Sequence, residues 1–309
     1  MIENSMPVSI KMKERLLPTF AINPNPILNS QQSIFLIGSC FSDAMLARFQ
    51  QRNIHAITNP FGTIYHPIPL LLELRKIINI AALTAMDNQA PTQHNQTDQL
   101  FQFNQKYHSL QHASRFSDNN PQALEETIIS TRDNAATQLK QASTVIITLG
   151  TAWYYYHQPT HAIVGNCHKL PGQQFQKNCS SVGEISRLLQ DFFNEATALF
   201  PNKTWIITVS PVRHLRDGLS QNLLSKSILH SATFEFLQNS NSSQIHYFPA
   251  YEIQREELND YRFFKDDLMH PTPWAEDYIF QRFTETFYSA SEQEILIQNF
   301  NSWKQSQHR

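Results

Sequence analysis

The chain has 309 residues, of which 41% are hydrophobic and 16% are Asp, Glu, Lys or Arg, and its formal net charge is −2. This length and apolar content favour one large or two smaller globular domains with a sizeable core. The small net charge and the lack of a long basic run argue against nucleic acid or an anionic membrane as a partner. No apolar run reaches the roughly 18–20 residues of a membrane span.

The N-terminus and the cysteines bear on the cellular compartment. Residues 1–6 (MIENSM) lack the basic start and apolar core of a signal peptide. Three cysteines, Cys40, Cys167 and Cys179, are too few for a disulfide framework. We therefore expect a cytoplasmic protein.

The first half of the chain begins with a lead-in over residues 1–30, where prolines discourage regular structure. The apolar run 34–37 then predicts a strand buried on both faces, which ends at Gly38. Further elements are expected as follows: a helix over 42–50, a strand over 53–58, a helix over 67–80, and a polar, Gln- and Asn-rich surface insertion over 81–120.

The second half alternates helices and strands. The expected elements are a helix over 121–142, a strand over 143–151, an extended stretch over 152–166, a helix over 182–200, a strand over 204–209, a helix over 220–237, a strand over 245–248, and a final helix capped by Thr272 with Pro273 in its first turn. This alternation predicts an α/β domain over residues 31–290, whose mostly parallel sheet is covered by helices on both faces. Residues 291–309 are expected to form a C-terminal tail.

The turn Gly38-Ser39-Cys40 is the first candidate functional feature, because it joins a buried strand to a helix. Open α/β sheets bind their ligands at this edge, and a helix N-terminus lowers the pKa of a thiol. The alternative is that Cys40 is a small buried hydrophobic residue, as free cysteines usually are.

A second candidate is Asp267, which lies three residues before His270. Such an acid can hold one imidazole nitrogen and fix the tautomer, while the other nitrogen serves as a base. Asp and His are also ordinary residues before a helix, but the position of this pair after the last expected strand, opposite the turn that bears Ser39 and Cys40, favours a functional role.

Several motifs together resemble the GSCFA domain family, and they span about residues 30 to 285. The matching stretches are Gly38-Ser39-Cys40-Phe41-Ser42 (with Ser42 where the family name has alanine), residues 59–63 (NPFGT), 149–153 (LGTAW), 166–171 (NCHKLP), 210–214 (SPVRH), 247–252 (YFPAYE), 260–264 (DYRFF) and 267–270 (DLMH). That family looks like a branch of the SGNH (GDSL-type) hydrolase superfamily. The resemblance implies a three-layer α/β/α sandwich with a flavodoxin-like sheet.

The resemblance also implies roles for single residues. Cys40 takes the place of the superfamily's nucleophile, with Ser39 in the place of an aspartate, although a one-residue shift of the turn would present Ser39 instead. His270 would be the base and Asp267 its partner. Gly62 would match the oxyanion glycine. Gly150 and Thr151 would match a block that elsewhere continues with asparagine, and here no asparagine follows.

The other motifs offer candidate substrate-binding residues. Arg213 and His214 follow a strand and would bind an anionic or hydroxylated substrate, or form a structural ion pair. The stretch with Asn166, His168 and Lys169 would line the same cleft, or else hold a turn. The aromatic residues 154–156 would stack on a sugar, but a half-buried strand is favoured.

The residues and the resemblance together predict an acyl-ester hydrolase or O-acyltransferase without a cofactor, acting on a small-molecule ester or acyl donor and acceptor. The O-acetyl group of a carbohydrate is a candidate by analogy alone. Two alternatives stay open. One is a non-catalytic binding module on the same fold. The other is a metal-dependent hydrolase built on His108 and His112, whose spacing of four suits one face of a helix.

Overall fold

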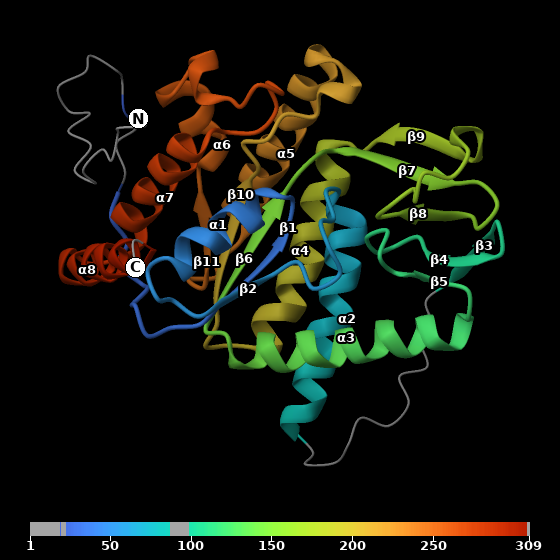
Figure 1. Cartoon of the computed structure of the whole chain (residues 1–309), viewed down its shortest axis with the longest axis horizontal. Helices are drawn as coiled ribbons and strands as arrows, with labels where there is room; N and C mark the ends of the chain where they lie inside the picture. Colours follow the sequence, from blue (N-terminus) through green and yellow to red (C-terminus); the bar gives the residue numbers. More distant parts are fainter. Residues whose placement is uncertain (1–18, 20–22, 87–98, 308–309) are drawn as a thin grey trace.

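A computed structural model describes Thr19, residues 23–86 and residues 99–307. A parallel five-stranded sheet lies at its centre (Figure 1). Its strands are β1 (Ile34–Gly38), β2 (Ala56–Thr58), β6 (Thr144–Leu149), β10 (Thr204–Val209) and β11 (Ile245–Phe248). They lie in the order β2-β1-β6-β10-β11, which is the order of flavodoxin-like sheets. The predicted α/β fold class is confirmed.

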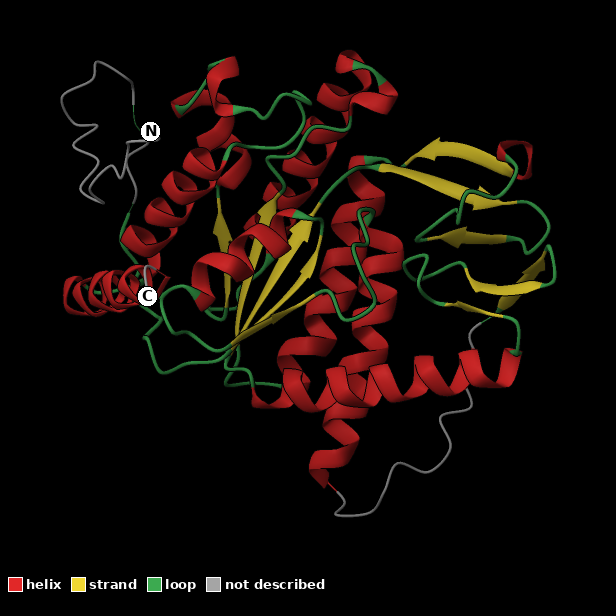
Figure 2. Ribbon diagram, viewed as in Figure 1, coloured by secondary structure: helices red, strands yellow, loops and turns green. Residues whose placement is uncertain are grey.

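Helices cover both faces of this sheet, as Figure 2 shows. They are α1 (Phe41–Gln50), α2 (Pro67–Met86), α3 (Pro121–Gln141), α4 (Val182–Leu199), α5 (Leu219–Asn239), the short α6 (Ala250–Glu252), α7 (Pro273–Phe287) and α8 (Ala290–Gln307). Short 3₁₀ turns lie at Gly172–Gln174, Leu215–Asp217 and Tyr261–Phe263, and a π-helical turn at Ile253–Glu257. Helices α2, α3, α4 and α5 contribute to the core on one face, and α1, α7 and α8 to the core on the other.

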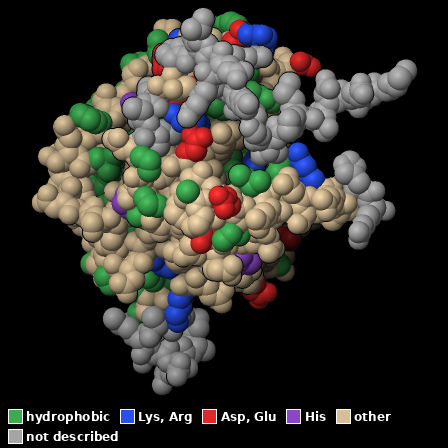
Figure 3. All heavy atoms as spheres, turned by 90° about the vertical axis from the view of Figure 1, so that its left-hand side faces the viewer, with side chains coloured by type: hydrophobic (Ala, Val, Ile, Leu, Met, Phe, Trp, Pro, Cys, Tyr) green, Lys and Arg blue, Asp and Glu red, His purple; other side chains and the backbone are tan. Residues whose placement is uncertain are grey.

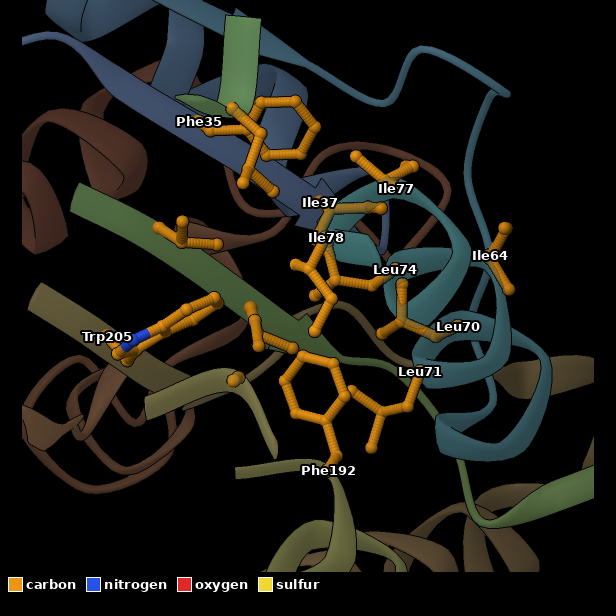
Figure 4. Close-up of a cluster of buried hydrophobic side chains, with 14 of the residues drawn as sticks. Phe35, Ile37, Ile64, Leu70, Leu71, Leu74, Ile77, Ile78, Phe192 and Trp205 are labelled. Atoms are coloured by element: carbon orange, nitrogen blue, oxygen red, sulfur yellow. The ribbon is translucent and has the colours of Figure 1, made fainter. Parts of the chain in front are cut away.

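Strand β1 is apolar throughout because each of its faces meets a different core. Ile34 and Leu36 pack with α1 and α7, whereas Phe35 and Ile37 pack with α2. Figure 4 shows Phe35 and Ile37 on the side of the sheet where α2 lies. Successive side chains of a strand point to opposite faces, so a strand between two helical layers has no polar position.

The start of α7 follows the predicted capping pattern. Thr272 accepts a hydrogen bond from the amide of Ala275 at 3.3 Å, and Pro273 occupies the first turn. The cap Thr272 lies two residues after His270, so it also fixes the end of the loop that carries the histidine.

Two small antiparallel sheets lie beside the helices (Figure 2), and the predicted pattern anticipates only the part of them that lies in the extended stretch 152–166. One contains β3 (Leu100–Phe103), β4 (Lys106–Ser109) and β5 (Ser117–Asp118), and the other contains β7 (Trp153–His157), β8 (Ala162–Val164) and β9 (Phe175–Cys179). The prediction of an irregular insertion over 81–120 is therefore wrong where the structure describes it: α2 continues to Met86, and a sheet begins at Leu100. Residues 87–98 lie outside the described part.

The expected C-terminal tail is also wrong, because residues 290–307 form α8. Leu296 and Phe300 of this helix are buried. The expected lead-in is ordered near its end, where Leu28 is buried and pairs with Tyr288. Leu28 and helix α8 therefore belong to the domain.

The surface agrees with the low charge of the sequence. On the face seen in Figure 3, the described Lys, Arg, Asp and Glu side chains are scattered and form no large cluster of one sign. None of the helices in the described ranges has both the length and the apolar character needed to cross a bilayer.

Candidate active site

The turn after β1 is tight enough to exclude any side chain at Gly38. Gly38 has φ +131°, and a Cβ there would lie 2.1 Å from the carbonyl oxygen of Thr148 on the neighbouring strand β6. Ser39 donates its amide to that same oxygen at 3.1 Å. Cys40 follows as the N-cap of α1. The glycine thus lets the chain turn against β6, and the turn leaves Cys40 at the carboxyl edge of the sheet.

Asn59 holds this turn from the loop after β2. Its side-chain oxygen accepts the Gly38 amide at 2.8 Å, and its side-chain nitrogen donates to Asp43 of α1 at 2.9 Å. Asn59 has φ +43°, in the left-handed region that asparagine tolerates better than most residues. One buried side chain therefore links the end of β1, the start of α1 and the loop that continues to Gly62.

Cys40, His270 and Asp267 lie in one row. The sulfur of Cys40 is 3.6 Å from Nε2 of His270, whose Nδ1 is 2.7 Å from Oδ2 of Asp267. The other carboxylate oxygen accepts the amides of His270 and Met269. These hydrogen bonds, that of the His270 amide foremost, lower the pKa of Asp267 to about 2. Asp267 is consequently a carboxylate near neutral pH, and it favours the His270 tautomer with a proton on Nδ1.

The two candidate nucleophiles, Ser39 and Cys40, differ in their burial and in their contacts. Ser39 is fully buried, and its hydroxyl oxygen accepts the amide of Phe41 within the turn. Cys40 is half-buried and faces His270, whose side chain is 37% exposed. The Cys40 register thus places a sulfur atom against the His270 imidazole, whereas Ser39 would reach it only if the turn rearranged.

The expected low pKa of Cys40 is wrong. Burial, and then the nearby charge of Asp43, raise the pKa of this thiol above its ordinary value. Its own amide, the charge of Lys226 and the hydroxyl of Tyr65 act in the opposite direction but do not reverse the shift. The thiol is therefore protonated near neutral pH, and a base must remove its proton during an attack.

The expected oxyanion donors are already hydrogen-bonded. The amide of Gly62 donates to Asn59 at 2.7 Å, and the amides of Gly150 and Thr151 both donate to the Tyr65 carbonyl, at 2.9 and 3.1 Å. These amides are not free to bind a substrate oxygen in this arrangement. Gly62 instead has a packing role, because a Cβ there would lie 2.3 Å from Cβ of Ala113.

Two other donors lie at the sulfur. The amide of Cys40 and the hydroxyl of Tyr65 both stabilise a negative charge on Cys40. The Tyr65 hydroxyl also accepts a hydrogen bond from Thr63 at 3.3 Å, and its ring packs edge-on against His214 with the ring centres 5.2 Å apart. Tyr65 was not among the predicted site residues, because one aromatic residue in a loop carries no local signal.

Arg213 and His214 reach the site from the loop after β10. Arg213 donates its amide to the carbonyl of Met269, next to His270, at 3.1 Å. Its guanidinium lies 3.8 Å from the ring centre of Phe264 and forms no ion pair with any described residue, so the predicted alternative of a structural ion pair is not found. Burial lowers the pKa of His214 to about 3, which makes this ring neutral near pH 7.

The stretch with Asn166, His168 and Lys169 holds a turn. Asn166 accepts the amide of His168 at 2.8 Å, and Nε2 of His168 lies 2.6 Å from the carbonyl of Ser109. His168 and Lys169 have φ of 49° and 59°, and Lys169 is exposed. Among the described residues, no hydrogen bond or ion pair joins this turn to Cys40 or His270. The aromatic stretch 154–156 lies within β7, as the strand interpretation predicted.

The two histidines of the metal alternative are not on a helix. His108 lies in β4, and His112 follows in a turn. Nδ1 of His112 is 2.7 Å from the hydroxyl of Ser109, and Nε2 is 3.2 Å from the carboxylate of Glu73, which Arg132 also binds. Both ring nitrogens are thus occupied in a fully buried network that ties this sheet to α2 and α3. The described part of the chain contains no group of three His, Cys, Asp or Glu side chains that could hold a metal ion.

Lys226 of α5 is a further site residue that sequence reasoning missed. The positive charge of Lys226 opposes the rise in the pKa of Cys40, although Lys226 lies 186 positions later in the chain. A signal does exist in the sequence: Lys226 is the one charged residue between Gly218 and Phe234, and it lies on the helix face that also buries Asn222 and Leu229. A lysine within a buried stripe is unusual.

Comparison with known proteins gives the family. Residues 33–283 match the model of the GSCFA family. The chain belongs to the GSCFA family. The matched range contains both the Cys40 turn and the Asp267–His270 pair, as the motif resemblance predicted. No curated protein matches the sequence of this GSCFA chain.

Two solved structures are similar to the GSCFA chain at a distant level. One is a family two carbohydrate esterase from Clostridium thermocellum in complex with cellohexaose, with 12% identity, 91% of this chain and 66% of that chain covered, and a TM-score of 0.37. The other is an acetyl xylan esterase, Est2A, from the rumen bacterium Butyrivibrio proteoclasticus, with 10% identity, the same coverages and a TM-score of 0.38. The GSCFA chain spans 66% of the length of each of these proteins. At this distance, neither structure carries an argument about the activity of this chain.

Proposed function

We propose that this GSCFA protein hydrolyses small acyl esters, or transfers their acyl group, through a covalent thioester on Cys40. The observation that carries the proposal is the row from the Cys40 sulfur to His270 and Asp267, with distances of 3.6 and 2.7 Å. A nucleophile, a base and an acid that orients the base are the three parts of a triad.

In the proposed first half-reaction, Nε2 of His270 takes the thiol proton as the sulfur attacks the ester carbonyl carbon. The resulting oxyanion receives hydrogen bonds from the Cys40 amide and the Tyr65 hydroxyl. The carbon–oxygen bond then breaks, and His270 returns the proton to the departing alcohol. A thioester on Cys40 remains.

In the second half-reaction, His270 takes a proton from water, which attacks the thioester carbonyl. The carbon–sulfur bond breaks, the thiolate regains a proton from His270, and the carboxylic acid leaves. An alcohol in place of water would give acyl transfer. The raised pKa of Cys40 supports this route, because a protonated thiol needs the base that His270 provides.

The neighbourhood of the row supports a polar alcohol part. Arg213 presents a guanidinium that forms no ion pair with any described residue, and its amide is bonded to Met269, next to His270. A guanidinium binds carboxylates and hydroxyl groups well. The proposed substrates are therefore short-chain esters of anionic or hydroxylated alcohols, and O-acetyl groups of carbohydrates belong to this class.

The test is turnover of 4-nitrophenyl acetate, with mass spectrometry of the Cys40 peptide after rapid acid quench. We expect acetylated Cys40 in the wild type, and a loss of about 10³-fold or more in turnover for Cys40→Ala. Ser39→Ala should lose much less. Cys179→Ala is the matched control, because Cys179 is a free cysteine on β9, outside the row.

Two results would contradict the proposal. A larger loss in Ser39→Ala than in Cys40→Ala would transfer the nucleophile's role to Ser39. If wild type, Cys40→Ala and His270→Ala all turned over aryl esters equally, the covalent mechanism would be refuted and the non-catalytic alternative favoured.

A further inference from the structure

A small pocket lies between helix α5 and the edge strand β11, away from Cys40. Its volume is about 340 Å³, at the low end of the range of about 300–1,000 Å³ that is usual for ligand pockets. In the order of the central sheet, β11 is three strands from β1, the strand that leads to Cys40 (Figure 1). The proposed mechanism uses none of the residues that line this pocket.

Three polar side chains meet in the wall of the pocket. The hydroxyl of Tyr247 donates to Oε1 of Glu252 at 2.7 Å, and Nδ1 of His230 lies 3.3 Å from both of these oxygens. Tyr247 and Glu252 belong to the stretch 247–252 (YFPAYE), one of the motifs on which the family resemblance rests. Because both neighbours of Nδ1 are oxygens and the Tyr247 proton is given to the carboxylate, the contacts favour a proton on Nδ1. Nε2 of His230 is then an acceptor.

Three polar atoms around the pocket have no hydrogen-bond partner within the described part of the chain. They are Nε2 of His230, Oγ1 of Thr233 and Oε2 of Glu252. Buried polar atoms without a partner are uncommon in folded proteins and costly. Thr233 is 1% exposed, whereas the side chains of His230 and Glu252 are 25% and 26% exposed, so small rotations of these two can present their atoms to a bound molecule. All three atoms can accept a hydrogen bond, so together they suit a donor group.

The charge of the pocket favours a cation as that donor. Glu252 forms no ion pair with a lysine or arginine among the residues that the structure describes, and its ion-pair contact is with His230. None of the side chains that line the pocket is a lysine or an arginine. A largely buried carboxylate gains from a charged partner, and it would repel an anionic one.

The apolar part of the wall comes from Phe234 and Leu237 of α5. Phe234 is 64% exposed, so a ligand that covers its ring removes apolar surface from water. The rings of Phe234 and Tyr247 would also attract a cation placed over their faces. An apolar wall with a few convergent polar groups is the usual composition of a small-molecule site.

We propose that this pocket binds a small organic amine. The ammonium group donates to Glu252, His230 and Thr233, and a primary ammonium has three N–H donors for these three acceptors. The apolar part of the amine packs on Phe234 and Leu237. The inference goes beyond the proposed ester chemistry and does not depend on it, because no residue of the pocket takes part in that chemistry.

The test is binding of three primary amines to the full chain, followed by ligand-observed saturation-transfer NMR titration. The amines are 2-phenylethylamine, cyclohexylmethylamine and hexylamine, and 2-phenylethanol and 3-phenylpropionate are the matched neutral and anionic probes. We expect at least 2-phenylethylamine to bind saturably, with a Kd on the order of 1 mM. The alcohol should bind about 10-fold more weakly, because it lacks the charge, and the carboxylate should not bind.

Variants locate the binding. Glu252→Gln keeps the shape of the side chain but removes its charge, and should weaken amine binding about 10-fold. Glu256→Gln is the matched control, because Glu256 is exposed and does not line the pocket. Cys40→Ala tests whether the amine binds at the catalytic edge instead, and both of these variants should bind as the wild type does. If Glu252→Gln does not fold, Phe234→Ala at an exposed position takes its place and should weaken binding about 5-fold.

Four results would overturn the proposal: no saturable binding of any of the three amines, equal binding of 2-phenylethanol and 2-phenylethylamine, wild-type binding in a folded Glu252→Gln protein, or loss of binding in Cys40→Ala. Sedimentation velocity provides a further check. A concentration-dependent dimer that Phe234→Ala abolishes would make the pocket part of an interface between copies of the chain, and would also overturn it. None of these readouts uses ester turnover, so failure of the proposed function and failure of this inference are distinguishable.

Discussion

Replacing Asn59 by alanine should disturb the fold and the candidate site together, because this side chain holds the turn that carries Cys40. Asn59 is 6% exposed, and its side chain accepts the Gly38 amide and donates to Asp43. Removing the acceptor leaves a buried amide without a partner, which costs about 1–3 kcal/mol. Alanine in a left-handed conformation adds about 1 kcal/mol. We therefore expect Asn59→Ala to lower the free energy of unfolding by about 3 kcal/mol.

Asn53 is a matched control for the backbone part of this cost. It also has a left-handed conformation, with φ 58° against 43° for Asn59, but it is exposed and lies after α1, away from the turn. Asn53→Ala should lose only the backbone contribution of about 1 kcal/mol. The difference between the two variants then measures the side-chain hydrogen bonds of Asn59.

The assay is urea unfolding followed by tryptophan fluorescence, since Trp205 lies fully buried in the core. Ester turnover should be measured at low urea, where both variants are folded. We expect turnover to fall in Asn59→Ala, because Cys40 loses its fixed position against His270, and to stay near wild type in Asn53→Ala. Equal loss of stability in the two variants, or full turnover in Asn59→Ala, would refute the reasoning.

Three further predictions concern the triad, the pH dependence and the turn. Asp267→Asn should keep the two amide contacts but favour the wrong His270 tautomer, so turnover of 4-nitrophenyl acetate should fall by about 10³-fold, with no rescue at higher pH; a loss below tenfold would argue against the triad. The pKa of His66 is lowered by burial from 6.5 to about 3, so its contribution to stability is complete above pH 6.5 and is lost as the pH falls toward 3. His66→Asn should therefore reduce the slope of unfolding free energy between pH 6 and 4 by about 1.4 kcal/mol per pH unit, measured by urea unfolding at each pH, and an unchanged slope would contradict the shift. Gly38→Ala places a Cβ 2.1 Å from the Thr148 carbonyl oxygen, so it should cost about 3 kcal/mol or more and abolish turnover; a thermal unfolding midpoint within a degree of wild type would show that the turn relaxes freely.

Local patterns in the sequence were sufficient for most of the central fold. The apolar runs at 34–37 and 204–209 predict strands covered on both faces, and Thr272 with Pro273 marks the start of α7. These features are readable because helix and strand periodicity, capping and burial act over a few neighbouring residues. The small sheets were predicted only in part: the extended stretch 152–166 covers β7 and β8, whereas β3, β4, β5 and β9 are strands of two to five residues in segments with no expected strand.

The candidate site was likewise predictable from the sequence only in part. The sequence determined which residue types stand at the edge of the sheet: a strand–turn–helix with Cys40, and an acid three residues before His270. Only the tertiary structure decided what these groups can do. It brings Cys40 and His270 together across 230 positions, occupies the amides of Gly62 and Gly150, and raises the pKa of the thiol.

The physical reason is that hydrogen-bond availability and charge are properties of the surroundings. Whether an amide is free depends on a carbonyl elsewhere in the chain, as the Tyr65 carbonyl shows for Gly150. Whether a thiol ionises depends on its burial and on charges from distant segments, here Asp43 and Lys226. A sequence states the identity of each group, but the field and the hydrogen bonds around it exist only after the chain has folded.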